Sequence, residues 1–150
     1  MLPATLGKFD VVIWNNISGD VLTLRERRSF QRWMAAGGAF VGVHGAGGDP
    51  IYFWDWYADT LLGARFAGHP DNPQFRESRV HIEASGSPLA AGLADSWTMS
   101  EEWYSFKTSP RTTGATIIAT LDETYLKPTD DPALNMGDHP IAWTRCIGKG

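Results

Sequence analysis

The sequence is short of cysteine and of long apolar runs. Cys146 is the one cysteine among 150 residues, which excludes an intramolecular disulfide and a metal site built from several thiolates. A membrane-spanning helix needs about 20 consecutive apolar residues, and no segment approaches that length. The first residues also lack the basic and apolar regions of a signal peptide. We therefore expect no membrane partner, and a cytoplasmic location is favoured.

An excess of basic charge is also missing, because 13 Lys and Arg residues face 17 Asp and Glu residues and give a formal net charge of −4. Without a basic field that gathers phosphates, nucleic acid is not expected as a partner. The composition, 43% hydrophobic and 20% charged, suits one globular domain that buries roughly 70% of its unfolded surface. We therefore expect residues 1–150 to form a single domain.

The first part of the chain has the pattern of a β-α-β unit. Residues 9–14 form a continuous apolar run, which predicts a strand buried on both faces. Thr23 and Glu26 have the spacing of a capping box, which predicts a helix from there to Ala36. A second apolar run, residues 39–43, predicts a strand that pairs in parallel with the first through a right-handed crossover. The fold class is therefore predicted as α/β.

His44 is the first candidate site residue, because it follows the second strand directly and precedes a cluster of glycines. A strand, a tight turn and a helix-compatible segment lift one side chain above a sheet, and glycines allow the turn to be sharp. Ligands of open α/β sheets bind beyond the carboxyl ends of the strands, where the Asn15-Asn16 loop and His44 would both lie, and Asn15 is selected from this loop. The alternative is a plain strand-to-helix loop with a hydrogen-bonded structural histidine.

Two further histidines and one carboxylate are also candidates. His69 and His139 each precede a proline, which holds them in an extended conformation. Glu101 and Glu102 are adjacent acids, and because neighbours on a strand point to opposite faces, only one of them enters a shared pocket; we favour Glu102. His81 falls on the polar side of an alternating strand and is a poor candidate.

Five motifs together resemble the ThuA-like, or trehalose-utilisation, family across almost the whole chain. They are Gly-Ala-Phe-Val-Gly-Val-His-Gly-Ala (38–46), Phe-Ala-Gly-His-Pro (66–70), Glu-Glu-Trp-Tyr (101–104), Asp-His-Pro-Ile-Ala-Trp (138–143) and Gly-Lys-Gly (148–150). The resemblance implies a fold similar to class I glutamine amidotransferases, a flavodoxin-like three-layer α/β/α arrangement with a mainly parallel sheet. Those enzymes carry a nucleophilic cysteine where this chain has His44, so glutaminase chemistry is not expected.

The resemblance also implies that elements are missing at both ends. Family members usually have a strand, a helix and a further strand before the equivalent of Phe9, and continue past Gly150. We therefore expect a single ThuA-like domain, residues 1–150, that is truncated at both ends, and a signal peptide would be lost with the missing N-terminus. Unpaired strand edges invite association, so a homo-oligomer is left open.

The family is associated with the uptake and breakdown of trehalose and related sugars, which implies a small-molecule carbohydrate as partner. The first interpretation is an enzyme that acts on a sugar or an oxidised sugar in a His-rich cleft. Its catalytic residues would be His44, Glu102 and His139, and its substrate-binding residues would be Asn15, His69, Trp103, Tyr104 and Trp143. The alternatives are a non-catalytic carbohydrate-binding module and a structural or interaction domain, so enzyme activity is left open.

No cofactor is required by the sequence, but a divalent metal such as Zn²⁺ is considered. His44, His69 and His139 have the right chemistry for a zinc site with an open position, although their wide spacing matches no local ligand motif. Only the fold would bring them together. We predict that these histidines, Glu102 and Tyr104 converge on one cleft at the carboxyl end of the sheet.

Overall fold

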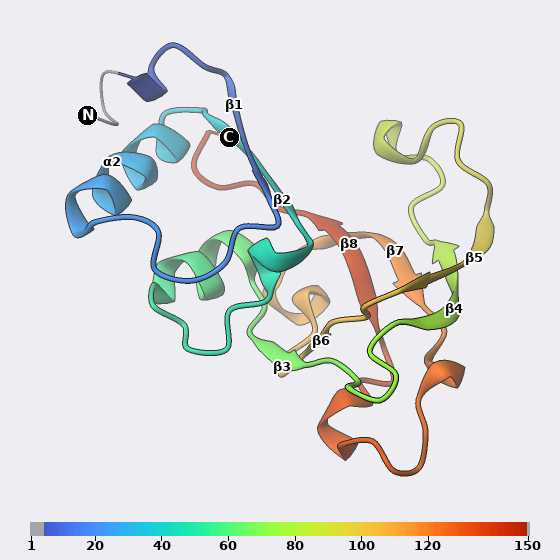
Figure 1. The fold of residues 1–150 in the computed structure, drawn as a ribbon. Helices are drawn as coiled ribbons and strands as arrows, with labels where there is room; N and C mark the ends of the chain where they lie inside the picture. Colours follow the sequence, from blue (N-terminus) through green and yellow to red (C-terminus); the bar gives the residue numbers. More distant parts are fainter. Residues whose placement is uncertain (1–4, 150) are drawn as a thin grey trace. The chain divides into compact units, whose positions relative to one another are not determined.

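The computed structural model describes residues 5–149, and the chain divides into two compact units, each with its own sheet and core (Figure 1). Unit 1 holds residues 1–61 and 146–150, and unit 2 holds residues 62–145. Met1 and Gly150, on which expectations about the chain ends depend, lie outside the described residues. The single ThuA-like domain over residues 1–150 stays a prediction.

Unit 1 contains the predicted β-α-β unit. Strand β1 (Val11–Asn15) pairs in parallel with β2 (Ala39–Val43), and helix α2 (Leu24–Ala35) connects them. The Thr23 hydroxyl accepts from the Glu26 backbone N–H, and the Glu26 carboxylate accepts from the Thr23 backbone N–H. The predicted pairing and capping box are therefore confirmed.

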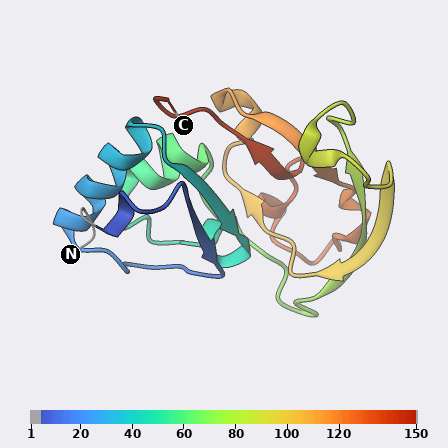
Figure 2. The ribbon, with the colours of Figure 1, turned by 90° about the horizontal axis from the view of Figure 1, so that it is seen from above.

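The core of unit 1 is aromatic, and helix α2 lies beside the small sheet of β1 and β2 (Figure 2). Phe30 of α2 is 1% exposed, and its ring centroid lies 5.8 Å from that of Trp14 on β1. Trp14 in turn stacks on Tyr57 of the π-helix Trp56–Leu62, with 5.1 Å between ring centroids. Phe30, which the sequence predicts as a core residue of this helix, is thus packed against strand β1.

The prediction that residues 9–14 are buried on both faces is wrong. Val11 is 46% exposed and Ile13 62%, and Val41 and Val43 beside them on β2 are also exposed. Alternate strand residues point to opposite faces, so these four side chains share one face of the two-stranded sheet. The aromatic core covers only the other face, where Trp14 lies.

Unit 2 is built from antiparallel strands, in contrast to the predicted fold. Its main sheet has the order β5-β4-β7-β8, with β4 (Arg76–Ile82), β5 (Ser96–Glu101), β7 (Thr116–Leu121) and β8 (Pro140–Thr144), and every pairing in it is antiparallel (Figure 1). A second sheet pairs β3 (Phe66–Gly68) with β6 (Ser105–Phe106), also antiparallel.

The predicted three-layer α/β/α fold with a mainly parallel sheet is therefore wrong. Parallel neighbours need a crossover connection, usually a helix, and residues 63–145 contain only 3-10 helices of three or four residues. Among the strands of residues 5–149, the one parallel pair is β1 with β2. In residues 5–149 no helix is long and apolar enough to cross a membrane.

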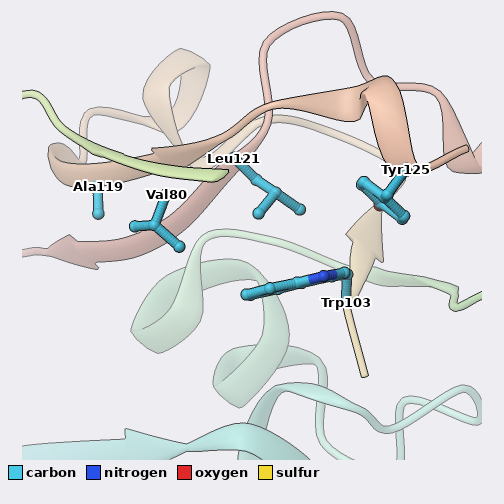
Figure 3. Packing of buried hydrophobic residues seen from close by; sticks show 5 residues of the cluster. All are labelled: Val80, Trp103, Ala119, Leu121 and Tyr125. Carbon is cyan, nitrogen blue, oxygen red and sulfur yellow. The ribbon is translucent and has the colours of Figure 1, made fainter. Parts of the chain in front are cut away.

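The core of unit 2 lies under the main sheet. Its buried cluster consists of Val80, Trp103, Ala119, Leu121 and Tyr125 (Figure 3). Along β4 the side chains alternate, so that Val80 is 1% exposed while its neighbour His81 faces solvent, as predicted. The indole N–H of Trp103 donates to the backbone oxygen of Arg76 at 2.7 Å, which ties the segment after β5 to β4.

An ion pair between buried Arg76 and half-buried Asp130 fixes the long loop of unit 2. The Arg76 guanidinium donates to both carboxylate oxygens of Asp130, at 2.5 and 2.8 Å, and to the backbone oxygen of Tyr125. Together with the backbone N–H of Lys127, the Arg76 guanidinium lowers the pKa of Asp130 to about 2. The charged form of Asp130 is thus the form that holds the loop on β4.

Candidate functional site

The turn after β2 places His44 in a left-handed backbone conformation. Its φ is +50°, and only Asn16 and Tyr52 share a positive φ among the described non-glycine residues. A non-glycine residue in this region costs about 1–3 kcal/mol, so surrounding contacts must hold it there. The sequence predicts a sharp turn at this position, and the strain falls on His44 itself, since Gly45 and Gly48 do not have a positive φ.

Asn16 is the residue that holds His44. Its side-chain oxygen lies 3.0 Å from Nδ1 of His44 and accepts the backbone N–H of Gly45 at 3.1 Å. The Gly45 N–H fixes which end of the amide points to the ring, so Nδ1 of His44 carries the proton. A Cβ on Gly45 would lie 2.5 Å from the same oxygen, which explains why the sequence has glycine there.

The sequence predicts that the Asn15-Asn16 loop lies near His44 and selects Asn15 as the site residue, whereas Asn16 makes the contact. Asn15 is the last residue of β1, opposite Val43, and it is exposed. The available signal was that asparagine tolerates the left-handed conformation and commonly ends a strand at a turn. Asn16 has a φ of +57°.

In unit 2, His69, Glu102 and Tyr104 form a second cluster. Nε2 of His69 lies 3.2 Å from Oε1 of Glu102, and its ring stacks on Tyr104 with 5.9 Å between centroids and 23° between planes. The ring of Phe66 on β3 packs edge to face against the Tyr104 ring, with 4.7 Å between centroids. The pairing of β3 with β6 brings these sequence-distant segments together. Glu102 is 8% exposed and Tyr104 is half-buried.

The electrostatics of this cluster keep the Tyr104 phenol protonated. Burial, followed by the nearby Glu102 carboxylate, raises the pKa of Tyr104 to about 12. The Gln74 side-chain amide donates to Oε1 of Glu102, the same oxygen that faces His69. No sequence pattern singled out Gln74, because it lies in an irregular loop 28 residues before Glu102.

Both ring nitrogens of His139 are already engaged inside the protein. Nδ1 lies 2.7 Å from Oε1 of Glu123 and Nε2 lies 3.0 Å from the backbone oxygen of Tyr104. The residue is 1% exposed. This geometry gives no support to His139 as a catalytic residue or metal ligand, because neither nitrogen is directed to a ligand. Glu123 was missed by sequence reasoning, since nothing local marks a glutamate of a short 3-10 helix as the partner of a distant histidine.

The two tryptophans predicted as a stacking surface pack inside unit 2. Trp103 is 6% exposed and belongs to the core cluster, so its faces are covered by protein. Trp143 is half-buried, its indole N–H donates to the backbone oxygen of Leu62 at 2.8 Å, and Phe106 meets it edge to face. Tyr104 is therefore the member of the predicted set that lies in the cluster with His69 and Glu102.

Four of the five residues predicted to converge lie in unit 2, and the predicted cleft at the carboxyl end of the sheet stays a prediction. His69, Glu102 and Tyr104 are in contact, and His139 reaches them through the Tyr104 backbone. His44 belongs to unit 1, so its approach to the other four stays a prediction. Across residues 5–149, no group of three His, Cys, Asp or Glu side chains is arranged to hold a metal ion, and the zinc hypothesis gains no support.

Comparison with known proteins identifies the family. The ThuA family, described as trehalose utilisation, matches residues 1–150. This chain belongs to the ThuA family. The resemblance drawn from the five motifs is thereby confirmed, and a role related to trehalose utilisation holds at the level of the family.

A solved structure supports the same assignment. The crystal structure of a ThuA-like protein from Bacteroides uniformis ATCC 8492 is similar to this ThuA-family chain, with 28% sequence identity and a TM-score of 0.76. The similarity covers 95% of this chain and 58% of that chain. No curated protein matches this chain.

Proposed function

We propose that this ThuA-family chain acts on a sugar or an oxidised sugar, with His69 and Glu102 as its proton-transferring pair. The observation that carries the proposal is the 3.2 Å contact between Nε2 of His69 and Oε1 of Glu102, beside the Tyr104 ring. The family membership supplies the substrate class, because the family is described as trehalose utilisation.

The hydrogen bonds of His69 indicate how the pair would hold a proton. Nδ1 of His69 faces the backbone oxygen of Pro70 at 3.1 Å, and a carbonyl only accepts, so Nδ1 carries a hydrogen. The contact between Nε2 and the carboxylate oxygen then requires a proton on one of these two atoms. That proton is the one that a general acid delivers to a sugar oxygen, and its loss leaves the pair as a base.

The neighbouring groups suit a hydroxyl-rich ligand. The Tyr104 phenol, whose pKa is raised to about 12, stays protonated at neutral pH and is hydrogen-bonded to Glu102, and an aromatic ring beside acid and base groups is a common neighbour of the C–H groups of a sugar. The Gln74 side-chain amide donates a hydrogen bond to the Glu102 carboxylate and holds it in place. His44 in unit 1 is a separate candidate base, since Asn16 fixes a proton on its Nδ1 and leaves Nε2 as the acceptor of the neutral ring.

The test separates catalysis from binding. Trehalose and an oxidised trehalose are each titrated into the chain by calorimetry, and products are followed by mass spectrometry. Glu102→Gln keeps the size of the side chain but removes its basic oxygen, so we expect binding within a few-fold of wild type and turnover reduced by about 10²–10⁴-fold. His81→Gln, on the solvent face of β4, is the matched control and should leave both unchanged.

The same experiment decides between the proposal and its alternative. Binding without turnover in the wild-type chain, unaffected by Glu102→Gln, would identify a non-catalytic carbohydrate-binding module. Absence of binding for both sugars would overturn the sugar-directed function altogether. His44→Gln, measured in parallel, reports separately on the turn of unit 1.

A further inference from the structure

The buried pair of His139 and Glu123 lies behind the proposed site and is not used in its proton transfer. His139 immediately precedes β8, and its backbone oxygen accepts the N–H of Leu121 at 2.9 Å, which ties the residue to β7. Its side chain is fully buried, and that of Glu123 is 14% exposed. Both positions are therefore fixed by the main sheet and by the 3-10 helix Glu123–Tyr125.

The hydrogen-bond partners determine the protonation of the ring. The Glu123 carboxylate accepts the backbone N–H groups of Met136 and Gly137, at 2.6 and 2.8 Å, one on each oxygen. Hydrogen bonds accepted on both oxygens favour the ionised form of a carboxyl group, and that form has no hydrogen to give to the ring. On the other side of the ring, the Tyr104 carbonyl oxygen also only accepts.

A neutral imidazole has one donor nitrogen and one acceptor nitrogen, so it would leave an acceptor facing an acceptor at one of these two contacts. A ring that carries hydrogens on both nitrogens satisfies both, and it also neutralises the buried carboxylate. We propose that His139 is held doubly protonated by Glu123 and acts as a positioning residue, because its second N–H fixes the carbonyl group of Tyr104.

Tyr104 connects this buried pair to the proposed site. Its carbonyl is bound by His139, while its ring stacks on His69 and its phenol is affected by Glu102. Ser105, the next residue, is fully buried and donates to the backbone oxygen of Leu134. The segment from Glu102 to Ser105 is thus anchored from within the unit, and the His139 contact anchors the backbone of Tyr104.

Two acids and one aromatic ring are neighbours of the His139 ring. Glu123 is the charged partner in contact, and the Tyr125 ring packs against the imidazole with 6.2 Å between centroids. The pKa of Asp138 is lowered, chiefly by the Arg111 guanidinium and in smaller part by His139. An acid on the chain-adjacent residue thus adds to the negative surroundings of the ring.

The first measurement uses the whole wild-type chain with ¹⁵N-labelled histidine. Nuclear magnetic resonance at pH 6 to 8 should show both ring nitrogens of His139 in the protonated form and slow to exchange, with His139→Gln used to assign the signals. One nitrogen at the shift of an unprotonated imidazole overturns the proposal. This measurement needs no ligand.

The second measurement tests positioning. Glu123→Gln should change the protonation of His139 and shift the signals of His69 and Tyr104, whereas Glu77→Gln, on an exposed position of β4, should leave them unchanged. Should Glu123→Gln not fold, His139→Gln is compared with the wild-type chain instead, and the His69 and Tyr104 signals should move there as well. Signals that do not move reduce His139 to a structural residue and overturn the positioning role.

The third measurement tests whether the positioning of Tyr104 affects sugar binding, and this part of the inference rests on the proposed function. Glu123→Gln should weaken trehalose binding at least tenfold relative to Glu77→Gln. If wild-type chain binds no trehalose, the proposed function fails while the protonation and positioning results stand. If trehalose binds equally to both variants, the proposed function stands and the positioning role fails.

Discussion

The side-chain oxygen of Asn16 lies 3.0 Å from Nδ1 of His44, and both residues have a left-handed backbone conformation. Two strained residues at the ends of neighbouring parallel strands therefore hold each other through one hydrogen bond. The Gly45 N–H shares the same oxygen. Removal of this oxygen should release the turn that carries His44.

Asn16→Ala is expected to destabilise unit 1 by about 1–3 kcal/mol, because the Gly45 N–H loses its partner and alanine tolerates a positive φ less well than asparagine. The measurement is urea unfolding followed by tryptophan fluorescence, with the ¹⁵N shifts of His44 as a local reporter. Asn15→Ala is the control, since Asn15 is exposed at the end of β1. Equal stability of the two variants would contradict the role given to Asn16.

Gly45→Ala tests the close approach of Asn16 directly. The added Cβ would lie 2.5 Å from the Asn16 oxygen and 3.3 Å from its backbone, so the turn must shift. We expect a loss of about 1–3 kcal/mol of stability, as for other overpacked positions. Gly7→Ala, where a Cβ would meet nothing within 4 Å, should change stability little. If both alanine variants melt at the same temperature, the contact at Gly45 does not constrain the turn.

The ion pair of Arg76 and Asp130 makes unit 2 sensitive to acid. The folded-state pKa of Asp130 is about 2, below the value of about 3.9 for an unfolded aspartate. The lowered pKa contributes stability that is fully present above the unfolded value and is lost as the pH falls toward 2.

Asp130→Asn should therefore be less stable than wild type above pH 5, and the difference should shrink between about pH 4 and pH 2. Thermal unfolding at a series of pH values measures this difference. Asp95→Asn is the control, because Asp95 is exposed and lies outside this ion pair. A difference that is constant down to pH 2 would show that the charge of Asp130 does not stabilise the loop.

The exposed face of β1 and β2 predicts association. Ile13 and Val41 are opposite each other in register, with 62% and 44% of their surfaces exposed. Replacement of both by threonine keeps the β-branched shape but lowers apolar exposure, so light scattering should show less concentration-dependent association. Leu89→Thr, at a 64% exposed position in unit 2, controls for a general effect. Association that is unchanged in the double variant and lowered in the control would contradict this prediction.

The sequence predicted unit 1 better than unit 2 for a physical reason. In unit 1 the two apolar runs are separated by a capped helix, and this local pattern dictates parallel pairing. In unit 2 the parallel sheet was an inference from the family resemblance alone. The alternation of Arg79, Val80, His81 and Ile82 was typical of an antiparallel sheet with one solvent face, and it was the better guide.

The candidate site residues also differ in how well the sequence predicted them. His69 and Glu102 were found because a proline and a pair of acids mark them in the sequence, and they lie in contact. The pairing of His139 with Glu123 was not predictable, since it depends on a 3-10 helix and on the register of β7 with β8. The sequence could not show whether Trp103 is a core residue or a sugar-stacking residue, because a tryptophan looks the same in the sequence in both roles. The structure places Trp103 in the core.

The last prediction uses the Tyr104 phenol as a reporter of Glu102. Burial is the larger cause of its raised pKa and the Glu102 carboxylate the next, through its charge and a hydrogen bond. Glu102→Gln removes the negative charge but not the burial, so the pKa of Tyr104 should fall from about 12 and stay above the ordinary value of about 10. Ultraviolet titration of phenolate absorbance measures the shift, and the difference from Tyr104→Phe isolates this residue from the other tyrosines. His81→Gln should not change the titration. An unchanged Tyr104 titration in Glu102→Gln would show that Glu102 does not affect the phenol, and Tyr104 would then not belong to the proposed site.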